Sequence, residues 1–483
     1  MNLLLVVEIF YILLVIVVCL RIIYDTRNSA KALAYLLFAV FVPVWGMIFY
    51  FVFGINYRKQ AIYSRKLIDD EHRLKKLTER IYAASEANLI AHAEGVTDGK
   101  KLVKLLLREN QSPLTSGNKV KLLINGEQKF DELFMAISEA RDHIHLEYYI
   151  IENDNIGNRL KDLLIKKARE GVKVRLIYDD FGSSSIRGRF VKELRKGGVE
   201  AYPFNRVRFL YFANRINYRN HRKIVVIDSR TAFIGGVNIS DRYINQPGDE
   251  DRQFWRDTHL RIDGPGIFLL QHIFVSDWNF CSGQKLDLDQ TYFSDPPAAQ
   301  GSANVQIAYS GPDSPNSTIM FSFLKAINLA QREILLTTPY LIPDDSVMDA
   351  LTMAALSGVK VKILIPGISD SKLVSMAAST NYGDLLRAGV EIYRYQKGFV
   401  HAKTLTVDGS ISIVGTANMD HRSFYLNFEV NAIIYSTEFA EELRRSFYKD
   451  IESSSLIQYE EWVSRPFYTK LAERTARLFS PLL

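Results

Sequence analysis

The sequence predicts an α/β protein made of two tandem copies of a layered domain, preceded by a two-helix transmembrane hairpin. Three observations predict it: two long apolar runs near the N-terminus, an internal duplication, and an alternation of helix-like and strand-like segments within each copy. Strands that alternate with helices are typical of layered α/β domains. The chain has 483 residues, which gives room for more than one such domain.

The composition is that of a folded protein with a mild positive charge. Hydrophobic residues make up 47% of the chain and charged residues 24%, which excludes a largely disordered protein. The net charge of +6 suits anionic partners, either acidic lipid surfaces or nucleic acid. There are two cysteines, and Cys19 lies in an apolar run, which argues against a disulfide framework.

The two apolar runs predict a membrane hairpin over residues 1–57. Residues 3–20 are apolar apart from Glu8, and residues 32–53 contain no charge. Each run is close to the roughly 20 residues that a helix needs to cross a bilayer. A signal peptide would carry a basic start and a small-residue cleavage site, and neither is present. A buried core helix is the alternative for the second run.

Basic residues predict the orientation of this hairpin. Arg27 and Lys31 lie between the runs, whereas a larger cluster follows the second run: Arg58, Lys59, Arg65, Lys66, Arg73, Lys75 and Lys76. Basic segments are retained in the cytoplasm. We therefore expect a multi-pass protein of the cell membrane, with the body of the protein in the cytoplasm.

The rest of the chain contains an internal duplication. We expect residues 58–118 to form an amphipathic linker, 119–290 the first copy and 291–483 the second, which ends in an amphipathic helix. Five residues recur 180 positions later: His221, Lys223, Asp228, Gly235 and Asn238 match His401, Lys403, Asp408, Gly415 and Asn418. Other segments match at slightly different offsets in the same order, as a duplication with loop insertions produces.

The repeated motif, His-x-Lys-x4-Asp, carries the candidate catalytic residues: His221, Lys223, Asp228, His401, Lys403 and Asp408. Residues two apart on a strand project from one face, so each His and Lys should point the same way. Asp408-Gly409 is a hairpin turn signal, and the returning strand leads to Asn418, or to Asn238 in the first copy. Each hairpin therefore presents a His, a Lys and a supporting Asn.

Two such hairpins brought together about a pseudo-twofold axis would form one pocket for a phosphodiester. Two ammonium groups can stabilise charge on the phosphoryl oxygens. One neutral imidazole can attack phosphorus, while the other, protonated, donates to the leaving alkoxide. A carboxylate behind each imidazole would fix its tautomer. The candidates are Asp257 and Glu429, each downstream of its motif.

This chemistry needs no cofactor and no metal. His143-x-His145 followed by Glu147 has the alternation of metal ligands on a strand, but we favour a wall of the pocket for these residues. The segment Arg206–Arg215 interleaves basic and aromatic residues. It could dip into an anionic lipid surface or form an ordinary amphipathic loop or strand.

At these residues the chain resembles the phospholipase D superfamily, and within it the bacterial cardiolipin synthases. The resemblance covers essentially the whole chain. Its segments are Pro43-x-x-Gly46-x-x-x-Tyr50-x-x-Phe53-Gly54, Arg219-Asn-His-Arg-Lys223, Trp255-Arg-Asp257, Gly415-Thr-Ala-Asn418, Arg422-Ser-Phe424, Asn427-Phe-Glu429 and Arg477-Leu-Phe-Ser-Pro-Leu-Leu483.

The resemblance implies two phospholipase D-like α/β/α sandwich domains and a reaction. One phosphatidylglycerol would form a phosphatidyl-histidine and release glycerol, and a second would take the phosphatidyl group to give cardiolipin. By the habit of the family, His221 would attack and His401 would be the acid. The superfamily usually carries Gly-Ser-x-Asn after the motif. Here Gly236 and Thr416 stand in the place of that Ser.

Three other functions stay open. The enzyme could be a hydrolase or another phosphatidyltransferase, using water, serine or a different alcohol. It could be a membrane-tethered nuclease, although the apolar hairpin and the lack of an extended basic run argue against nucleic acid. It could be a scaffold without activity, although the intact His and Lys of both motifs argue against this.

Overall fold

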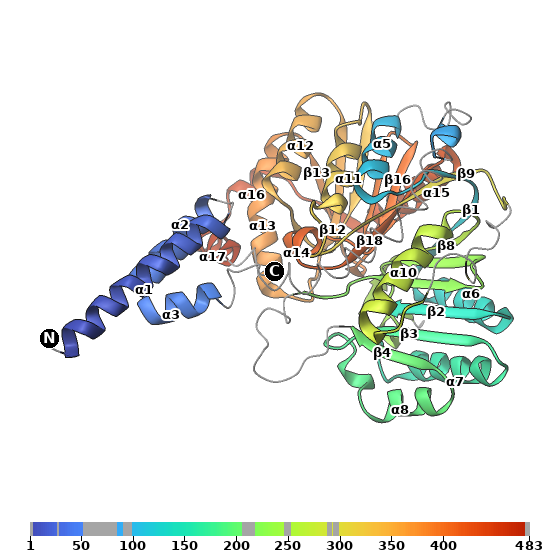
Figure 1. The fold of residues 1–483 in the computed structure, drawn as a ribbon. Helices are drawn as coiled ribbons and strands as arrows, with labels where there is room; N and C mark the ends of the chain where they lie inside the picture. The colour runs from blue at the N-terminus through green and yellow to red at the C-terminus, as the bar shows by residue number, and fades with distance from the viewer. Residues whose placement is uncertain are drawn as a thin grey trace. The chain divides into compact units, whose positions relative to one another are not determined.

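The computed structural model describes residues 3–26, 29–51, 85–89, 99–204, 218–245, 253–286, 292 and 299–478 (Figure 1). The chain divides into two compact units, Met1–Asp69 with Val207–Tyr218, and Asp70–Arg206 with Arg219–Leu483. Most of the expected linker, the basic cluster after the second apolar run, the Arg206–Arg215 segment and the last five residues lie outside the described residues.

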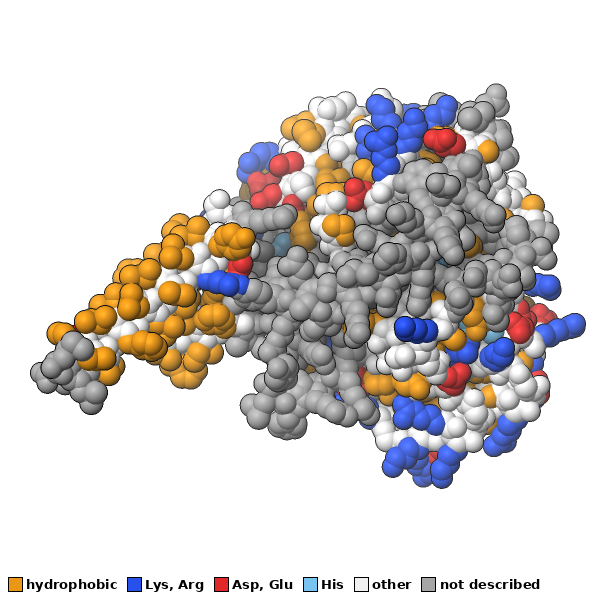
Figure 2. All heavy atoms as spheres, in the orientation of Figure 1, with side chains coloured by type: hydrophobic (Ala, Val, Ile, Leu, Met, Phe, Trp, Pro, Cys, Tyr) orange, Lys and Arg blue, Asp and Glu red, His pale blue; other side chains and the backbone are white. Residues whose placement is uncertain are grey.

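The N-terminal unit is built from apolar helices: α1 (Leu3–Asp25), α2 (Ser29–Phe41) and α3 (Pro43–Phe49). Within the described part of the chain, one helix is long and apolar enough to cross a membrane, at Leu5–Asp25. The second apolar run is divided between α2 and α3. Pro43 has no N–H to continue the helix, and Val42 before it is not helical. Figure 2 shows hydrophobic side chains over most of the visible surface of these helices.

The other unit is organised around one sheet of 15 strands. The first half of the sheet comprises β1 (Thr115–Ile124), β2 (His143–Tyr148), β3 (Lys173–Asp179), β4 (Glu200–Phe204), β5 (Lys223–Ile227), β6 (Thr231–Gly235) and β8 (Thr258–Asp263). The second half comprises β9 (Ala303–Ser310), β10 (Glu333–Thr337), β12 (Lys360–Pro366), β13 (Glu391–Tyr395), β15 (Thr404–Val407), β16 (Ile411–Gly415), β18 (Glu429–Tyr435) and β19 (Ser454–Leu456).

The two halves have the same strand order, read outward from the antiparallel pair β1–β9 at the centre. On one side the order is β8-β6-β5-β2-β3-β4, and on the other β18-β16-β15-β10-β12-β13, with β19 beyond. In each half the outer strands are parallel (β2-β3-β4 and β10-β12-β13) and the inner ones antiparallel. The two motif hairpins, β5–β6 and β15–β16, therefore occupy equivalent places.

Helices cover both faces of this sheet. One face carries α6 (Asn125–Glu139), α7 (Asn155–Arg169) and α8 (Arg189–Lys196) on the first half, and α5 (Lys100–Asn110), α11 (Thr318–Ile327), α12 (Asp345–Leu356) and α13 (Lys372–Arg387) on the second. The opposite face carries α10 (Ile267–Ser282) and α15 (Thr437–Ile451), which share one apolar cluster. Because both faces are covered, β5 and β15 are buried throughout, and residues 224–227 of β5 are a continuous apolar run.

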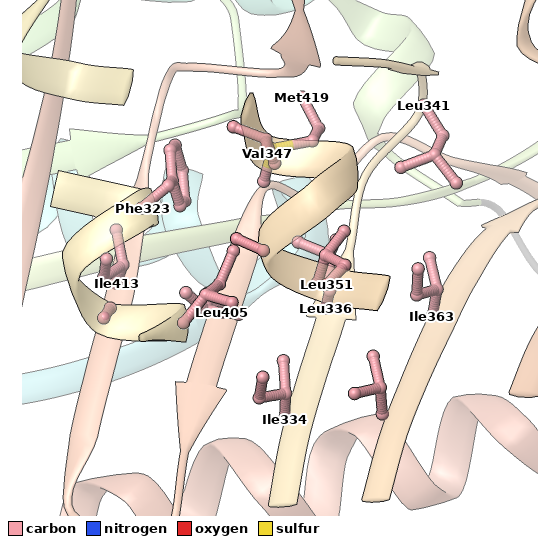
Figure 3. Packing of buried hydrophobic residues seen from close by; sticks show 14 of the residues in the cluster. Phe323, Ile334, Leu336, Leu341, Val347, Leu351, Ile363, Leu405, Ile413 and Met419 are labelled. Atoms are coloured by element: carbon pink, nitrogen blue, oxygen red, sulfur yellow. The ribbon is translucent and has the colours of Figure 1, made fainter. Parts of the chain in front are cut away.

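The core of the second half illustrates this packing (Figure 3). Phe323 of α11 and Val347 and Leu351 of α12 point toward side chains of the sheet, which are Ile334 and Leu336 of β10, Ile363 of β12, Leu405 of β15 and Ile413 of β16. Helix α5 joins the same core through one apolar face. Residues 99–114, expected as part of a linker, therefore belong to the folded body.

The C-terminal part begins with short α14 (His421–Tyr425), and after α15 continues as α16 (Tyr459–Val463) and α17 (Phe467–Arg477). Helix α17 packs against α13. It leaves Phe467, Tyr468 and Leu471 exposed beside Lys470 and Arg474, so its surface carries both apolar and basic side chains. Such a face is suited to the boundary between water and lipid.

Candidate active site

Both motif histidines line one cavity of about 440 Å³. His221 lies two residues before β5 and His401 three residues before β15. The other lining residues are Tyr149, Ile150, Arg219, Asn238, Arg242, Tyr243, Trp255, Tyr340, Ile342, Asp370, Val374, Asn418, Asp420, Arg422 and Asn427. The duplication therefore supplies one shared cavity with a histidine from each copy.

Each histidine is paired with a carboxylate from the other half of the sheet. Nδ1 of His221 lies 2.9 and 3.1 Å from the two carboxylate oxygens of Glu429 at the start of β18. Nδ1 of His401 lies 2.8 Å from Oδ2 of Asp257, between β7 (Phe254–Arg256) and β8. Both carboxylates are fully buried. With Nδ1 bound in this way, Nε2 is the ring nitrogen left for chemistry.

Backbone hydrogen bonds hold each motif against the other half. The N–H of His221 donates to the carbonyl of Phe428 (3.0 Å), and the N–H of His401 donates to the carbonyl of Arg256 (2.7 Å). Short strand β14 (Gly398–Val400), just before His401, pairs in parallel with β7. The backbone of each histidine is thus hydrogen-bonded to the residue that directly precedes the carboxylate orienting its ring.

The motif lysines are buried next to the histidines. Nζ of Lys223 donates to the carbonyl of His221 (2.9 Å), and Nζ of Lys403 donates to the carbonyl of His401. Burial lowers the pKa of Lys223 to about 7 and that of Lys403 to about 8, although Glu429 and Asp257 oppose this effect. The Lys403 charge also lowers the pKa of Lys223. The two motifs therefore interact electrostatically across the halves.

Burial of the two motif histidines favours neutral imidazoles. Burial lowers the pKa of His221, with Glu429 opposing, and burial with Lys403 lowers the pKa of His401 to about 3. A bound anion would favour the protonated form of a nearby imidazole. A neutral imidazole can attack phosphorus, and an imidazole that gains a proton in the complex can donate it to a leaving group.

The lysine pKa values predict the alkaline limb of the pH profile. An ammonium group is charged below its pKa, so both charges are lost as pH rises through about 7 and 8. We expect kcat/KM, which reports the free enzyme, to fall above this range. The limb of kcat should lie at higher pH, because a bound phosphodiester raises the lysine pKa. Initial rates in mixed micelles from pH 5 to 10 measure both kcat and kcat/KM. A kcat/KM that stays constant to pH 10 would contradict the assignment of the alkaline limb to the lysines.

Asp228 and Asp408, expected among the catalytic residues, do not line the cavity. Asp228 sits in the turn after β5, where its carboxylate accepts from the backbone N–H groups of Arg141, Asp142 and His143 at 2.8–2.9 Å. Asp408 accepts in the same way from residues 331–333, at 2.7–2.8 Å. Both have φ of 51°, a conformation that Asp tolerates better than most residues. They fasten the motif hairpin to the neighbouring strand.

Replacing Asp228 should therefore reduce stability more than chemistry. Asp228→Ala leaves three backbone N–H groups without their charged acceptor, and we expect a loss of about 2–3 kcal/mol in the free energy of unfolding. The kcat of the folded fraction should change less than about threefold. Thermal unfolding in detergent measures the first effect. Asp162→Ala, an exposed position on α7, is the control and should leave the midpoint unchanged.

The supporting asparagines line the cavity in both halves. Nδ2 of Asn238 donates to the Tyr243 hydroxyl (2.7 Å), and Nδ2 of Asn418 donates to Asp420 (3.0 Å). Oδ1 of Asn418 is buried and has no hydrogen-bond partner among the described residues. It is therefore available to a donor group of a ligand.

Gly236 and Thr416 differ because each lies against a different carboxylate, Asp257 for Gly236 and Glu429 for Thr416. The Thr416 hydroxyl donates to Glu429 and accepts from the N–H of Val430 (3.0 Å). At Gly236, an added Cβ would lie 2.1 Å from Oδ1 of Asp257. The Asp257 carboxylate itself occupies the space that a side chain at position 236 would take, and its Oδ1 accepts a hydrogen bond from the N–H of Thr258 (2.7 Å). The position without a hydroxyl, Gly236, therefore lies beside the shorter side chain, Asp257.

Gly236→Ala should consequently displace Asp257 and disorient His401. A Cβ cannot remain 2.1 Å from an oxygen, so the carboxylate or the strand must move. We expect kcat to fall about 10- to 100-fold, the range found when a group that orients a histidine is lost. Thr416→Ser keeps the hydroxyl and is the matched control in the other half. Equal activity of the two variants would show that the close contact at Gly236 is unimportant.

His143, His145 and Glu147 are not a wall of this cavity. They point toward the α10 side of the sheet, where His145 contacts Gln271 (2.7 Å) and Arg175 (3.2 Å) and Glu147 accepts from Asn220. His143 contacts Asp142 (2.7 Å). All three are buried. The alternation on β2 therefore serves a buried polar network, which corrects the expectation of a pocket wall.

Several lining residues had no role in the sequence analysis. Arg219, Trp255, Arg422 and Asn427 appear there only within the matched segments of the family, and Tyr149 and Tyr340 gave no signal. The Tyr149 ring packs edge-on against His221 (4.8 Å between centroids), and the Tyr340 hydroxyl donates to Asp370 (2.7 Å). These residues come from strand ends far apart in sequence, so a motif search cannot group them.

The chain is similar to known proteins over most of its length. A family model described as "Cardiolipin synthase, PLD-like domain" matches residues 133–254 and 323–451, and one described as "Phospholipase_D-nuclease N-terminal" matches residues 9–54. The chain is 42% identical over 470 residues to a cardiolipin synthase of Geobacillus kaustophilus (strain HTA426), covering 97% of this chain and 92% of the relative. It is 40% identical over 480 residues to the major cardiolipin synthase of Bacillus subtilis (strain 168), covering 99% and 98%.

Among solved structures, the phosphatidylserine synthase of Haemophilus influenzae Rd KW20 has the same fold. The TM-score is 0.58 and the identity 14%, and the match covers 79% of this chain and all of the other. At this identity the likeness concerns the α/β fold alone.

Proposed function

The chain belongs to the cardiolipin synthases with phospholipase D-like domains, and from this premise we propose that it condenses two phosphatidylglycerol molecules into cardiolipin and glycerol. The reaction passes through a covalent phosphatidyl-histidine. One phosphodiester is exchanged for another, so no nucleotide is needed to drive it. The same exchange requires that a lipid alcohol, and not water, reaches the intermediate.

The observation that carries this proposal is the pair of histidines in one cavity, each bound at Nδ1 by a buried carboxylate of the other half. A single histidine could act as nucleophile or as acid. Two, each with Nε2 available, supply both roles at once. Intact His and Lys in both copies also count against a scaffold without activity.

In the first step, Nε2 of one histidine attacks phosphorus, and the P–N bond forms as the P–O bond to glycerol breaks. The other histidine donates its proton to the leaving alkoxide. Lys223 and Lys403 stabilise the charge on the phosphoryl oxygens. In the second step, the now neutral histidine takes the proton from the acceptor hydroxyl, whose oxygen displaces the first histidine. By the habit of the family, His221 attacks and His401 transfers the proton.

The membrane part of the proposal rests on the apolar helices. We propose a multi-pass protein of the bacterial cell membrane, with α1 and the α2–α3 segment both inserted and the catalytic body in the cytoplasm. Anionic lipids are its partners. Residues 119–290 and 291–483 form two phospholipase D-like domains about a pseudo-twofold axis, which the repeated strand order supports. Substrate then comes directly from the bilayer.

Purified protein with labelled phosphatidylglycerol in vesicles tests the function. Cardiolipin and glycerol should appear in equal amounts. Phosphatidic acid without cardiolipin would replace the proposal by a hydrolase, and incorporation of serine in preference to phosphatidylglycerol would replace it by another phosphatidyltransferase. A short DNA duplex in the same assay should stay intact, because the cavity lies in a membrane-anchored protein without an extended basic run.

A further inference from the structure

One corner of the cavity carries a guanidinium group and an amide oxygen that have no hydrogen-bond partner among the described residues. Arg219 is 3% exposed, yet neither Nη1 nor Nη2 has a hydrogen bond to any described residue. Oδ1 of Asn427, also buried, has no hydrogen-bond partner in the described part of the chain. Both residues line the cavity, as does Arg422. A buried guanidinium without hydrogen bonds is costly unless a ligand satisfies it.

The nearest carboxylate does not satisfy Arg219. Oδ1 of Asp179 is 3.9 Å from Nη1, beyond hydrogen-bond distance. Its oxygens already accept from the backbone N–H groups of Phe181, Gly182 and Asn220, at 2.9–3.1 Å. Burial lowers the pKa of Arg219, and the charge of Arg422 lowers it further, although Asp179 and Tyr149 oppose. Two arginine charges therefore face one corner, where an anion would relieve their repulsion.

This corner breaks the symmetry of the duplication. The residues two before each histidine are Arg219 and Phe399, and the residues two before each carboxylate are Asn427 and Trp255. On the His401 side, Phe399 pairs with Trp255 across β14–β7, with ring centroids 4.9 Å apart. On the His221 side, the N–H of Phe428, next to Asn427, donates to the Arg219 carbonyl (2.8 Å). An aromatic pair on one side thus corresponds to a polar pair on the other.

We propose that Arg219 and Arg422, beside Asn427, form a subsite for the second phosphodiester, which belongs to the acceptor lipid and remains in the product. The inference rests on the proposed function. A neutral alcohol such as glycerol has one reacting hydroxyl, whereas an acceptor phosphatidylglycerol has a hydroxyl and a phosphodiester three carbons away. The guanidinium groups bind the anionic oxygens of that phosphodiester. The subsite thereby selects a lipid acceptor over glycerol and water.

The test compares two soluble acceptors with phosphatidylglycerol as donor and the full-length protein in mixed micelles. Labelled glycerol accepts the phosphatidyl group to give labelled phosphatidylglycerol. Labelled glycerophosphoglycerol, which has the phosphodiester but no acyl chains, gives a cardiolipin lacking two acyl chains. Neither acceptor has tails, so their ratio isolates recognition of the phosphodiester from partition into the micelle.

We expect the unaltered protein to favour glycerophosphoglycerol in kcat/KM, and Arg219→Gln to reduce that preference about 10- to 100-fold. Exchange of glycerol into phosphatidylglycerol should change less than about threefold, because the transferred phosphoryl group is held by the lysines and histidines. Arg189→Gln, on α8 with a 94% exposed side chain, is the control. The preference of Arg219→Lys should lie between those of the unaltered protein and Arg219→Gln, since lysine keeps the charge and lacks the planar guanidinium.

Equal loss of both transfers in Arg219→Gln would overturn the subsite, since it would place the arginine at the transferred phosphoryl group or in the fold. No preference for glycerophosphoglycerol in the unaltered protein would overturn it as well. If Arg219→Gln does not accumulate as folded protein, the same ratio of glycerophosphoglycerol to glycerol transfer is measured in Arg422→Gln and Arg219→Lys, and it tests the subsite in the same way. Failure of the unaltered protein to make cardiolipin from phosphatidylglycerol would reject the proposed function, a separate outcome.

Discussion

Replacing either His221 or His401 with Ala should lower cardiolipin formation about 10³-fold or more. Both line one cavity, and the proposed mechanism uses one as nucleophile and the other as acid and base. Loss of a positioned proton donor alone costs about 10²–10⁴-fold, and loss of the nucleophile removes the covalent route. Initial rates with labelled phosphatidylglycerol measure this. Near-full turnover by either variant would reject the two-histidine mechanism.

The two variants should differ when the leaving group needs no proton. A phosphatidyl ester of p-nitrophenol releases a stable anion, so its first step does not require the acid. With this donor we expect His401→Ala to release nitrophenol rapidly and to retain the phosphatidyl group on the protein. His221→Ala should release almost none. The opposite pattern would exchange the two roles. If neither variant released nitrophenol from this donor, His401 would be needed for more than proton transfer.

The sequence predicted those parts of the molecule that depend on local pattern. The duplicated His-x-Lys motif, the alternation of strands and helices and the apolar α1 each leave a regular trace in the chain. The second apolar run was harder to interpret. Its composition suits one membrane helix, but the missing N–H of Pro43 divides it into α2 and α3.

Features that depend on which strand ends meet could not be predicted. Asp228 is part of the motif, yet its position in a turn directs it to the backbone of residues 141–143, away from the cavity. His143 and His145 share a face of β2, but the sequence does not say that α10 covers that face. Arg219 becomes notable only when its duplicate, Phe399, is seen in an aromatic pair. Each conclusion needed the sheet order.

The carboxylate partners of the histidines could not be assigned correctly from the sequence either, because they too depend on which strand ends meet. The sequence offered Asp257 and Glu429 as carboxylates downstream of their own motifs, but each binds the histidine of the other copy. A single copy of the domain therefore cannot orient its own histidine in this way. The exchange of carboxylates explains why both copies are needed for one active site.

Asp257→Asn should therefore resemble His401→Ala, although Asp257 lies in the other copy. An amide can hold Nδ1 only in the wrong tautomer or by a weaker contact, and comparable changes in other His-based sites cost up to about 10⁴-fold in kcat. We expect a loss of about 10²–10⁴-fold with phosphatidylglycerol and a much smaller one with the nitrophenyl donor. Glu429→Gln, behind His221, should lose activity with both donors. Asp263→Asn, an acceptor for Arg261 and Thr231 at the far end of β8, is the matched control and should stay within about threefold.

The double variants decide whether each carboxylate acts through its own histidine. In the nitrophenyl assay, adding Asp257→Asn to His401→Ala should cause little further loss, because the orienting group has nothing left to orient. Adding Glu429→Gln to His401→Ala should reduce nitrophenol release about as much as Glu429→Gln does alone. If Asp257→Asn instead removed nitrophenol release from His401→Ala, the pairing would follow the copies and not cross between them. The shared cavity would then require a different arrangement of its two halves.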